Sequence, residues 1–250
     1  MRVYYTGGSL GDTYVIVCKL YSIAKNEKIL CKHYIEDDAI KPAVREIYSL
    51  MPNIAVEWRD DDEHLGITGQ FLHHKLRGEQ MTYLPEENMY NLRLERYPEF
   101  EIGSIERFKL PDDYVVLQLQ SGANPKKTRK MSAEEVDGIL KDSEYPIVVI
   151  GKDNVDVSRI EDDIIDLRWA TSIKEAINII KCARHFYGCL GLLNLVALSH
   201  RVYSTLYMPL YLKDKHAYES RIFPIVEWRR YAGGSQNRIL EKLAMRLLRY

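Results

Sequence analysis

The hydrophobic pattern of the first sixty residues alternates between the spacing of strands and the spacing of helices. Three β-rich runs predict strands at residues 2–6, 28–35 and 53–58. Between the first two strands, apolar side chains recur at helical spacing over residues 12–25, and residues 40–50 predict a second helix that ends before a proline. This β-α-β-α-β order is typical of a doubly wound α/β domain.

A second alternation of the same kind follows a linker-like segment at residues 108–114. Further strands are predicted at residues 114–120, 146–151, within 164–169, at the start of 185–200 and at 202–208. Two helices begin at capping boxes, SAEE (132–135) and SIKE (172–175). We therefore expect two Rossmann-like α/β halves, residues 1–109 and 110–250. The later part of the first half has only weak helix signals, at 69–77 and 86–96.

Composition and charge narrow the class of protein. The chain has 250 residues, 46% hydrophobic and 28% charged, which is an ordinary globular profile. Its net charge of −1 predicts no overall electrostatic attraction to nucleic acid or acidic lipid. No apolar run approaches the ~18 residues of a membrane span, and the first residues have no signal core, so we expect a cytoplasmic protein without a transmembrane segment.

Two further features of the composition bear on function. The four cysteines lack the CxxC spacing of a zinc site or a disulfide framework; they are Cys18, Cys31, Cys182 and Cys189. The last thirty residues carry seven basic residues and two acids, and a basic helix is predicted from about Ser235. Such a stripe is usually a solvated face, but it also suits an anionic acceptor, nucleic-acid phosphates or a membrane surface.

A glycine-rich loop follows the first predicted strand. The sequence GGSLGD (7–12) matches neither the dinucleotide-binding nor the triphosphate-binding fingerprint. Gly8, Ser9 and Gly11 still offer a backbone that approaches a ligand closely, at a helix N-terminus that favours negative charge. Asp12 closes the loop, and from these residues alone it either caps the helix or accepts a proton in a reaction.

Four segments, taken in order, resemble a known family. They are VYYTGGSLGDTYVIVCKL, YVVLQLQSGANPKKTRKMSAEEVDGIL, YPIVVIGKDN and IIDLRWATSIKEAINIIKCARHFYGCLGLLNLVAL. In this order and spacing the chain resembles the heptosyltransferase-like glycosyltransferases, GT-B enzymes related to glycosyltransferase family 9, over about residues 1–50 and 108–207. The resemblance implies two halves that face each other across a cleft, with the acceptor on the N-terminal side and a nucleotide sugar on the C-terminal side.

The resemblance also assigns chemistry to Asp12. In the family this aspartate is the general base of an inverting, metal-independent transfer, in which the donor is a substrate and no further cofactor takes part. The base removes a proton from a hydroxyl of a glycan or another acceptor, which then attacks the sugar. A carboxylate at a helix start suits that role and still caps the helix.

The second half would hold the diphosphate of the donor. By resemblance, the residues after its first strand that do so are Ser121, Gly122, Lys126, Lys127, Arg129 and Lys130. A charge run of this kind is equally typical of a solvated loop. Further along, Gly191 keeps the glycine of the family's nucleotide-binding string, and Asn194 stands in place of its histidine, where it could hydrogen-bond a phosphate or ribose.

Two alternatives remain open. Cys189 and Asn194 depart from the family pattern, which favours a catalytically inactive protein of the same architecture that binds a nucleotide or glycan. A nucleic-acid-modifying glycosyltransferase is the other alternative, and the basic C-terminal stretch is its only support.

Overall fold

A computed structural model describes residues 1–60, 98–100, 102–122, 129–155, 164–209 and 226–231, and divides into two compact units. Unit 1 comprises residues 1–103 and unit 2 residues 104–250, whereas the sequence pattern placed the boundary between 109 and 110. The expected weak helices at 69–77 and 86–96, and the basic C-terminal helix, lie outside the described residues.

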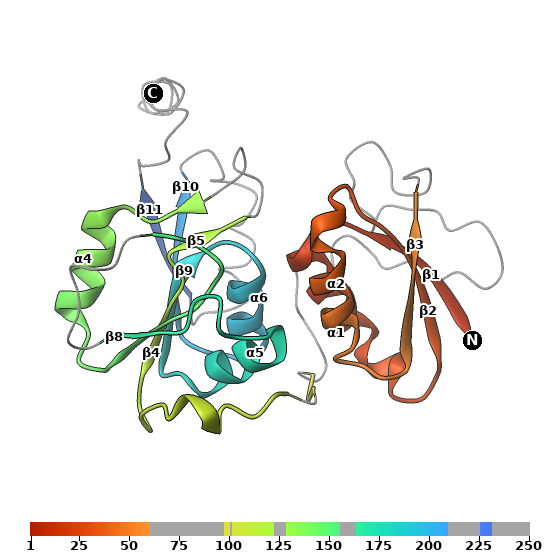
Figure 1. Ribbon diagram of the computed structural model, residues 1–250, viewed down its shortest axis with the longest axis horizontal. Coiled ribbons are helices and arrows are strands. Elements are labelled where there is room, and N and C mark those ends of the chain that lie inside the picture. The colour runs from red at the N-terminus through yellow and green to blue at the C-terminus, as the bar shows by residue number, and fades with distance from the viewer. Residues whose placement is uncertain (61–97, 101, 123–128, 156–163, 210–225, 232–250) are drawn as a thin grey trace, which may run out of the picture. The chain divides into compact units, whose positions relative to one another are not determined.

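Unit 1 contains the predicted β-α-β-α-β order. Its elements are β1 (Arg2–Gly7), α1 (Leu10–Ala24), β2 (Ile29–Tyr34), the short 3-10 helix η1 (Asp38–Ile40), α2 (Lys41–Tyr48) and β3 (Ile54–Arg59). The strands pair in parallel in the order β1-β2-β3. Because both crossovers advance in the same direction, α1 and α2 lie on one face of the sheet (Figure 1).

The core of unit 1 forms between that face and the two helices. Val44 and Ile47 of α2 are fully buried, as are Ile16 and Leu20 of α1. Phe100 also packs against α1, where its ring meets two tyrosine rings edge to face at centroid distances of 5.7 and 6.0 Å. Unit 1 therefore has an apolar core of its own.

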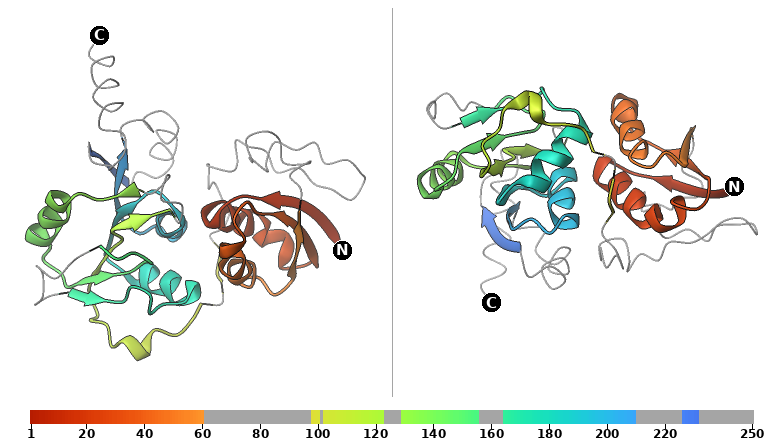
Figure 2. Two further views of the ribbon diagram at one scale, coloured as in Figure 1. Left: turned by 45° about the horizontal axis from the view of Figure 1, so that its top comes forward. Right: turned by 90° about the horizontal axis from the view of Figure 1, so that it is seen from below.

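Unit 2 is built on a larger sheet. Its elements are η2 (Glu106–Phe108), β4 (Val115–Leu117), β5 (Gln120–Ser121), β6 (Arg129–Lys130), α4 (Ala133–Asp142), β7 (Ile147–Val149), β8 (Ile164–Asp166), α5 (Ile173–Cys182), β9 (His185–Cys189), α6 (Leu192–Ser199), β10 (Ser204–Pro209) and β11 (Val226–Tyr231). Six strands pair in parallel in the order β11-β10-β9-β4-β7-β8. The crossovers run in both directions from β4, so α4 covers one face of the sheet and α5 with α6 covers the other (Figures 1 and 2).

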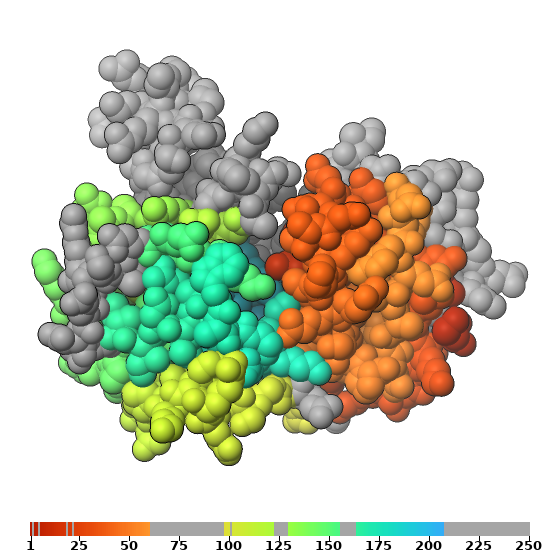
Figure 3. All heavy atoms as spheres, viewed as in Figure 1, coloured from red at the N-terminus to blue at the C-terminus, as the bar shows by residue number. Residues whose placement is uncertain are grey.

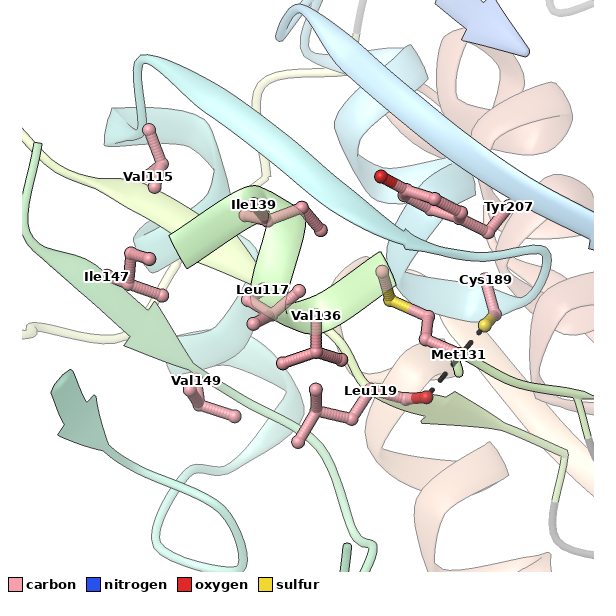
Figure 4. Close-up of a cluster of buried hydrophobic side chains, with 10 residues drawn as sticks. All are labelled: Val115, Leu117, Leu119, Met131, Val136, Ile139, Ile147, Val149, Cys189 and Tyr207. Carbon is pink, nitrogen blue, oxygen red and sulfur yellow. Dashed lines mark hydrogen bonds between the residues drawn. The ribbon is translucent and has the colours of Figure 1, made fainter. Parts of the chain in front are cut away.

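A buried apolar cluster fills the space between α4 and the sheet (Figure 4). Val136 and Ile139 of α4 pack toward Leu117 of β4 and Val149 of β7. On the surface, the segment around η2 lies against the region of α5, shown as yellow against blue-green atoms in Figure 3. Arg107 forms an ion pair with Glu175 there, at 2.8 Å between Nε and Oε1.

Two elements differ from the sequence-based expectation. The strand predicted at 114–120 is divided, because β4 belongs to the large sheet whereas β5 leaves it and pairs antiparallel with β6. The strand β11 falls in the stretch that sequence analysis treated as a basic tail, and it pairs in parallel with β10. Both capping boxes are confirmed, with Ser132 bonded to Glu135 and Ser172 bonded to Glu175.

Candidate functional site

The sequence-predicted residues that the structure describes gather in two groups, one in each unit. The group in unit 1 is the turn from β1 into α1. Asp12 lies in the first turn of α1, where its Oδ2 accepts hydrogen bonds from the Ser9 amide and the Ser9 hydroxyl, both at 2.8 Å. The Thr13 hydroxyl donates to the Ser9 carbonyl at 2.9 Å. Asp12 therefore caps α1, which was one of its two expected roles.

The capping geometry depends on Gly8. Its φ of +112° lies in the region that favours glycine, and a Cβ at this position would lie 2.7 Å from Asp12 Oδ2. Gly11 lies inside the first turn of α1. Gly8 thus lets the loop pass closely over the carboxylate.

Capping uses only one oxygen of Asp12. Its Oδ1 accepts no hydrogen bond from any of the residues that the structure describes, and the residue is half-buried. A carboxylate held by one oxygen leaves the other able to accept a proton. The role of Asp12 as a base stays a prediction, and it is compatible with the observed cap.

Three polar side chains lie buried beside this loop, and sequence analysis did not single them out. His33 Nδ1 lies 3.0 Å from both the Thr6 hydroxyl and the Tyr48 hydroxyl, and those two hydroxyls are also 3.0 Å apart. Burial lowers the pKa of His33 to about 4, although the Gly8 backbone works in the opposite direction. The imidazole is therefore neutral at physiological pH. A threonine and a histidine at inward positions of two strands were the available signals.

The group in unit 2 lies at the carboxyl ends of β4 and β9. Ser121 donates its hydroxyl to the Leu190 carbonyl, which ties the start of the basic loop to the turn before α6. Gly122 follows with a φ of +93°. A Cβ on Gly191 would lie 3.0 Å from the Ser121 side chain, so these two predicted residues are close together.

The basic loop of the sequence lies between β5 and β6, which pair antiparallel. Arg129 and Lys130 are the two residues of β6, opposite Ser121 and Gln120 in the ladder, and the Lys130 side chain is exposed. Lys126 and Lys127 lie outside the described residues. Whether these cations bind a diphosphate stays a prediction.

Asn194 has a structural role. It is fully buried, and its Oδ1 accepts a hydrogen bond from the Gly191 amide at 2.5 Å, which caps the N-terminus of α6. Its Nδ2 is buried without a partner among the residues that the structure describes. Contact between Asn194 and a phosphate or ribose stays a prediction, and the amide of Gly191 already has a partner.

A charged network at the carboxyl ends of β7 and β8 also went unnoticed in the sequence. Arg168 donates from Nη1 to Asp153 at 3.0 Å and from Nη2 to Asp166 at 2.6 Å. Asp166 and Asp153 raise the pKa of Arg168, and Arg168 lowers the pKa of Asp166. Polar residues at the ends of two predicted strands, in GKD and DLRW, were the signal that could have identified this network.

Comparisons with known proteins identify the fold. No protein-family model and no curated protein matches the chain. Among solved structures, a glycosyl transferase family 9 protein from Veillonella parvula superposes with a TM-score of 0.57 at 12% identity, covering 92% of this chain and 86% of that one. An ADP-heptose LPS heptosyltransferase II from E. coli superposes with a TM-score of 0.58 at 12% identity, covering 100% and 99%.

The chain therefore has the heptosyltransferase-like α/β fold of the GT-B class, as its motif order predicted. Within the described part of the chain, no helix combines the length and the apolar character that crossing a membrane requires.

Proposed function

We propose that this protein is a glycosyltransferase that moves a sugar from a nucleotide-sugar donor to an acceptor hydroxyl. The observation that carries the proposal is the carboxylate of Asp12, which is fixed at the start of α1 by Oδ2 while Oδ1 accepts no hydrogen bond from the described residues. This carboxylate belongs to a chain whose fold is shared with solved glycosyltransferases, and that shared fold supports the choice of reaction.

The proposed step is an inverting displacement. Asp12 Oδ1 takes the proton from the acceptor hydroxyl, and the acceptor oxygen forms a bond to the anomeric carbon. The bond from that carbon to the diphosphate oxygen breaks on the opposite face, and its electron pair leaves with the nucleoside diphosphate. General-base assistance of this kind contributes roughly 10²- to 10⁴-fold to the rate.

In this proposal the donor is bound by unit 2. Ser121 and Gly122 lie close to the turn at Gly191, and together these two segments would contact the diphosphate. Four cations of the basic segment offset the charge that develops on the diphosphate without a metal ion; they are Lys126, Lys127, Arg129 and Lys130. The acceptor, a glycan or another hydroxyl compound, is placed on the side of Asp12.

The decisive variant is Asp12→Asn. Asparagine retains an oxygen that accepts from the Ser9 amide, so the cap of α1 survives while the base is lost. We expect transfer to fall by about 10²- to 10⁴-fold with unchanged donor binding. The assay follows nucleoside diphosphate released from a panel of nucleotide sugars, with and without hydroxyl acceptors.

Glu135→Gln is the matched control, because Glu135 holds the same third position in the capping box of α4. It makes the same acid-to-amide change at a helix start in unit 2, and we expect full transfer activity. An Asp12→Asn protein that transfers sugar at the wild-type rate would refute the role of Asp12.

Asn194 favours one second function, which is binding of a nucleotide or glycan without transfer. Its side chain is buried and engaged with Gly191, so it replaces the family's histidine with a capping residue. A wild-type protein that binds a nucleotide sugar but releases no nucleoside diphosphate under any acceptor condition would establish this second function. The support for a nucleic-acid substrate, the basic C-terminal stretch, lies mostly outside the described residues.

A further inference from the structure

An unusually exposed tryptophan follows β8. Trp169 has 60% of its surface exposed and a φ of +62°, in the left-handed region. Large aromatic side chains are normally mostly buried, and bulky residues at positive φ are uncommon because the backbone conformation is strained. Strain of this kind is found where the surrounding structure enforces it, often at ligand sites.

The surrounding structure holds Trp169 at two points. Its backbone amide donates to the Gly151 carbonyl, and its indole Nε1 donates to the Asp153 carbonyl, both at 3.0 Å. The indole is therefore fixed in one orientation although most of its surface is open to solvent.

The support beneath the indole is itself rigid. Asp153 is buried, and its Oδ1 accepts from the Val155 amide at 3.1 Å and from Arg168 at 3.0 Å. Arg168 is clamped in turn to Asp166, with Nε 2.9 Å and 3.1 Å from its two carboxylate oxygens. An aromatic ring fixed in advance loses little conformational entropy when a flat molecule stacks on it.

The position of Trp169 relates it to the donor site of unit 2. In the sheet order β9-β4-β7-β8, Gly191 follows β9, Ser121 lies beyond β4, and Trp169 follows β8. These strands are parallel, so all three positions lie beyond the same edge of the sheet, where doubly wound folds bind nucleotides. Neighbouring strands are about 4.8 Å apart, which places β8 about 14 Å from β9. An extended nucleoside diphosphate spans a distance of this order.

We propose, on the basis of the proposed function, that Trp169 is the platform on which the nucleobase of the nucleotide-sugar donor stacks. The base rests on the indole beyond β8, and the diphosphate extends along the sheet edge toward Gly191. Trp169 is thus a specificity-determining residue for a nucleoside diphosphate sugar as opposed to a sugar phosphate.

Two substitutions test this platform. Trp169→Gly removes the ring and also relieves the positive φ, so we expect an unchanged or higher Tm together with about tenfold weaker binding of nucleoside diphosphates. Trp169→Phe keeps an aromatic face and should retain most of the affinity. A loss of affinity without a loss of stability distinguishes removal of a binding surface from general unfolding.

A fluorescence measurement observes the contact directly. The chain has three tryptophans, so Trp58→Phe with Trp228→Phe leaves Trp169 as the single reporter. The protein is titrated with ADP, GDP, UDP and CDP in turn and with inorganic pyrophosphate, with affinities measured in parallel by calorimetry. We expect a bound nucleoside diphosphate to quench the Trp169 emission, and pyrophosphate to bind wild type and Trp169→Gly equally.

The outcomes separate the two proposals. A nucleoside diphosphate that binds wild type and Trp169→Gly equally, or that binds without changing the Trp169 emission, overturns the platform while the proposed function stands. If wild type binds no nucleoside diphosphate and no nucleotide sugar, the proposed function fails and the platform fails with it.

Discussion

His33 is a buried imidazole whose neutral form favours the folded state of unit 1. Its pKa falls from 6.5 to about 4 because burial disfavours the charged ring. Between pH 6.5 and 4 the unfolded chain therefore binds a proton that the folded chain does not. The stability contributed by the neutral ring is present above pH 6.5 and is lost as the pH falls toward 4, by about 1.4 kcal/mol per pH unit.

We predict that His33→Asn removes this part of the pH dependence. Asparagine keeps an oxygen near the position of Nδ1, so the Thr6 and Tyr48 hydroxyls retain an acceptor. Urea unfolding between pH 7 and 4.5 should show a shallower loss of stability for the variant than for wild type. His200 in unit 2, whose pKa is also lowered to about 4 by burial, titrates equally in both proteins and cancels in the comparison. An equal loss of unfolding free energy between pH 7 and 4.5 in wild type and in His33→Asn would contradict the prediction.

Single residues were predictable where their partners are close in the sequence. Asp12 interacts with Ser9, three residues away, and both sit in a recognisable helix start. His33 instead meets Thr6 and Tyr48, which are 27 and 15 residues away. The local pattern places Thr6 and His33 at inward strand positions, but it does not show that they meet Tyr48, because only the packing of β1, β2 and α2 creates these contacts.

At the scale of elements, the two capping boxes share a sequence pattern but differ electrostatically. Arg107 donates to both carboxylate oxygens of Glu175, at 2.8 and 3.1 Å, and lowers the pKa of that carboxyl to about 2. Burial raises the pKa of Glu135, although hydrogen bonds from Ser132 work in the opposite direction. The tie between η2 and the start of α5 is therefore strongest when Glu175 is ionised.

We predict that Glu175→Gln lowers Tm at pH 7 by about 2 °C, because glutamine still caps α5 but no longer pairs with the arginine. The ionic contribution is present above pH 4.5 and is lost as the pH falls toward 2, so the difference from wild type should shrink through that range. Glu135→Gln is the control. Because the pKa of Glu135 is raised in the folded protein, the stability of wild type relative to this variant should increase as the pH falls. Thermal melts from pH 3 to 7 measure both, and a constant difference for Glu175→Gln would contradict the prediction.

The order of elements followed from hydrophobic periodicity, whereas the choice of partner strand did not. Residues 114–120 read as one strand because their apolar and polar positions do not show that β5 leaves the sheet to pair with β6. Residues 226–231 contain two consecutive arginines, so the sequence was interpreted as a basic tail, although these residues form a strand that pairs with β10. Strand pairing is a tertiary property, so local propensity determines it only weakly.

At the scale of the whole molecule, each unit contains its own β-sheet and its own hydrophobic core. No strand of the described residues pairs across the boundary after Gly103. The site residues predicted from the sequence divide in the same way, with Asp12 in unit 1 and the donor-side residues in unit 2. If the proposed function is right, loss of the base in unit 1 and loss of donor binding in unit 2 should therefore be separable as measurements.

We predict two unfolding transitions in calorimetry, of which a nucleoside diphosphate stabilises only one. Ligand at 100 times its Kd adds about 2.7 kcal/mol to the unit that binds it, and this should be unit 2. Ile47→Ala and Ile177→Ala identify the transitions, because each truncates a fully buried side chain in one unit, at a cost of about 2–5 kcal/mol. If the nucleotide raised the transition that Ile47→Ala lowers, the donor would bind to unit 1. If both variants shifted one common transition, the units would unfold together, and independent cores would not suffice to make the folding of this chain modular.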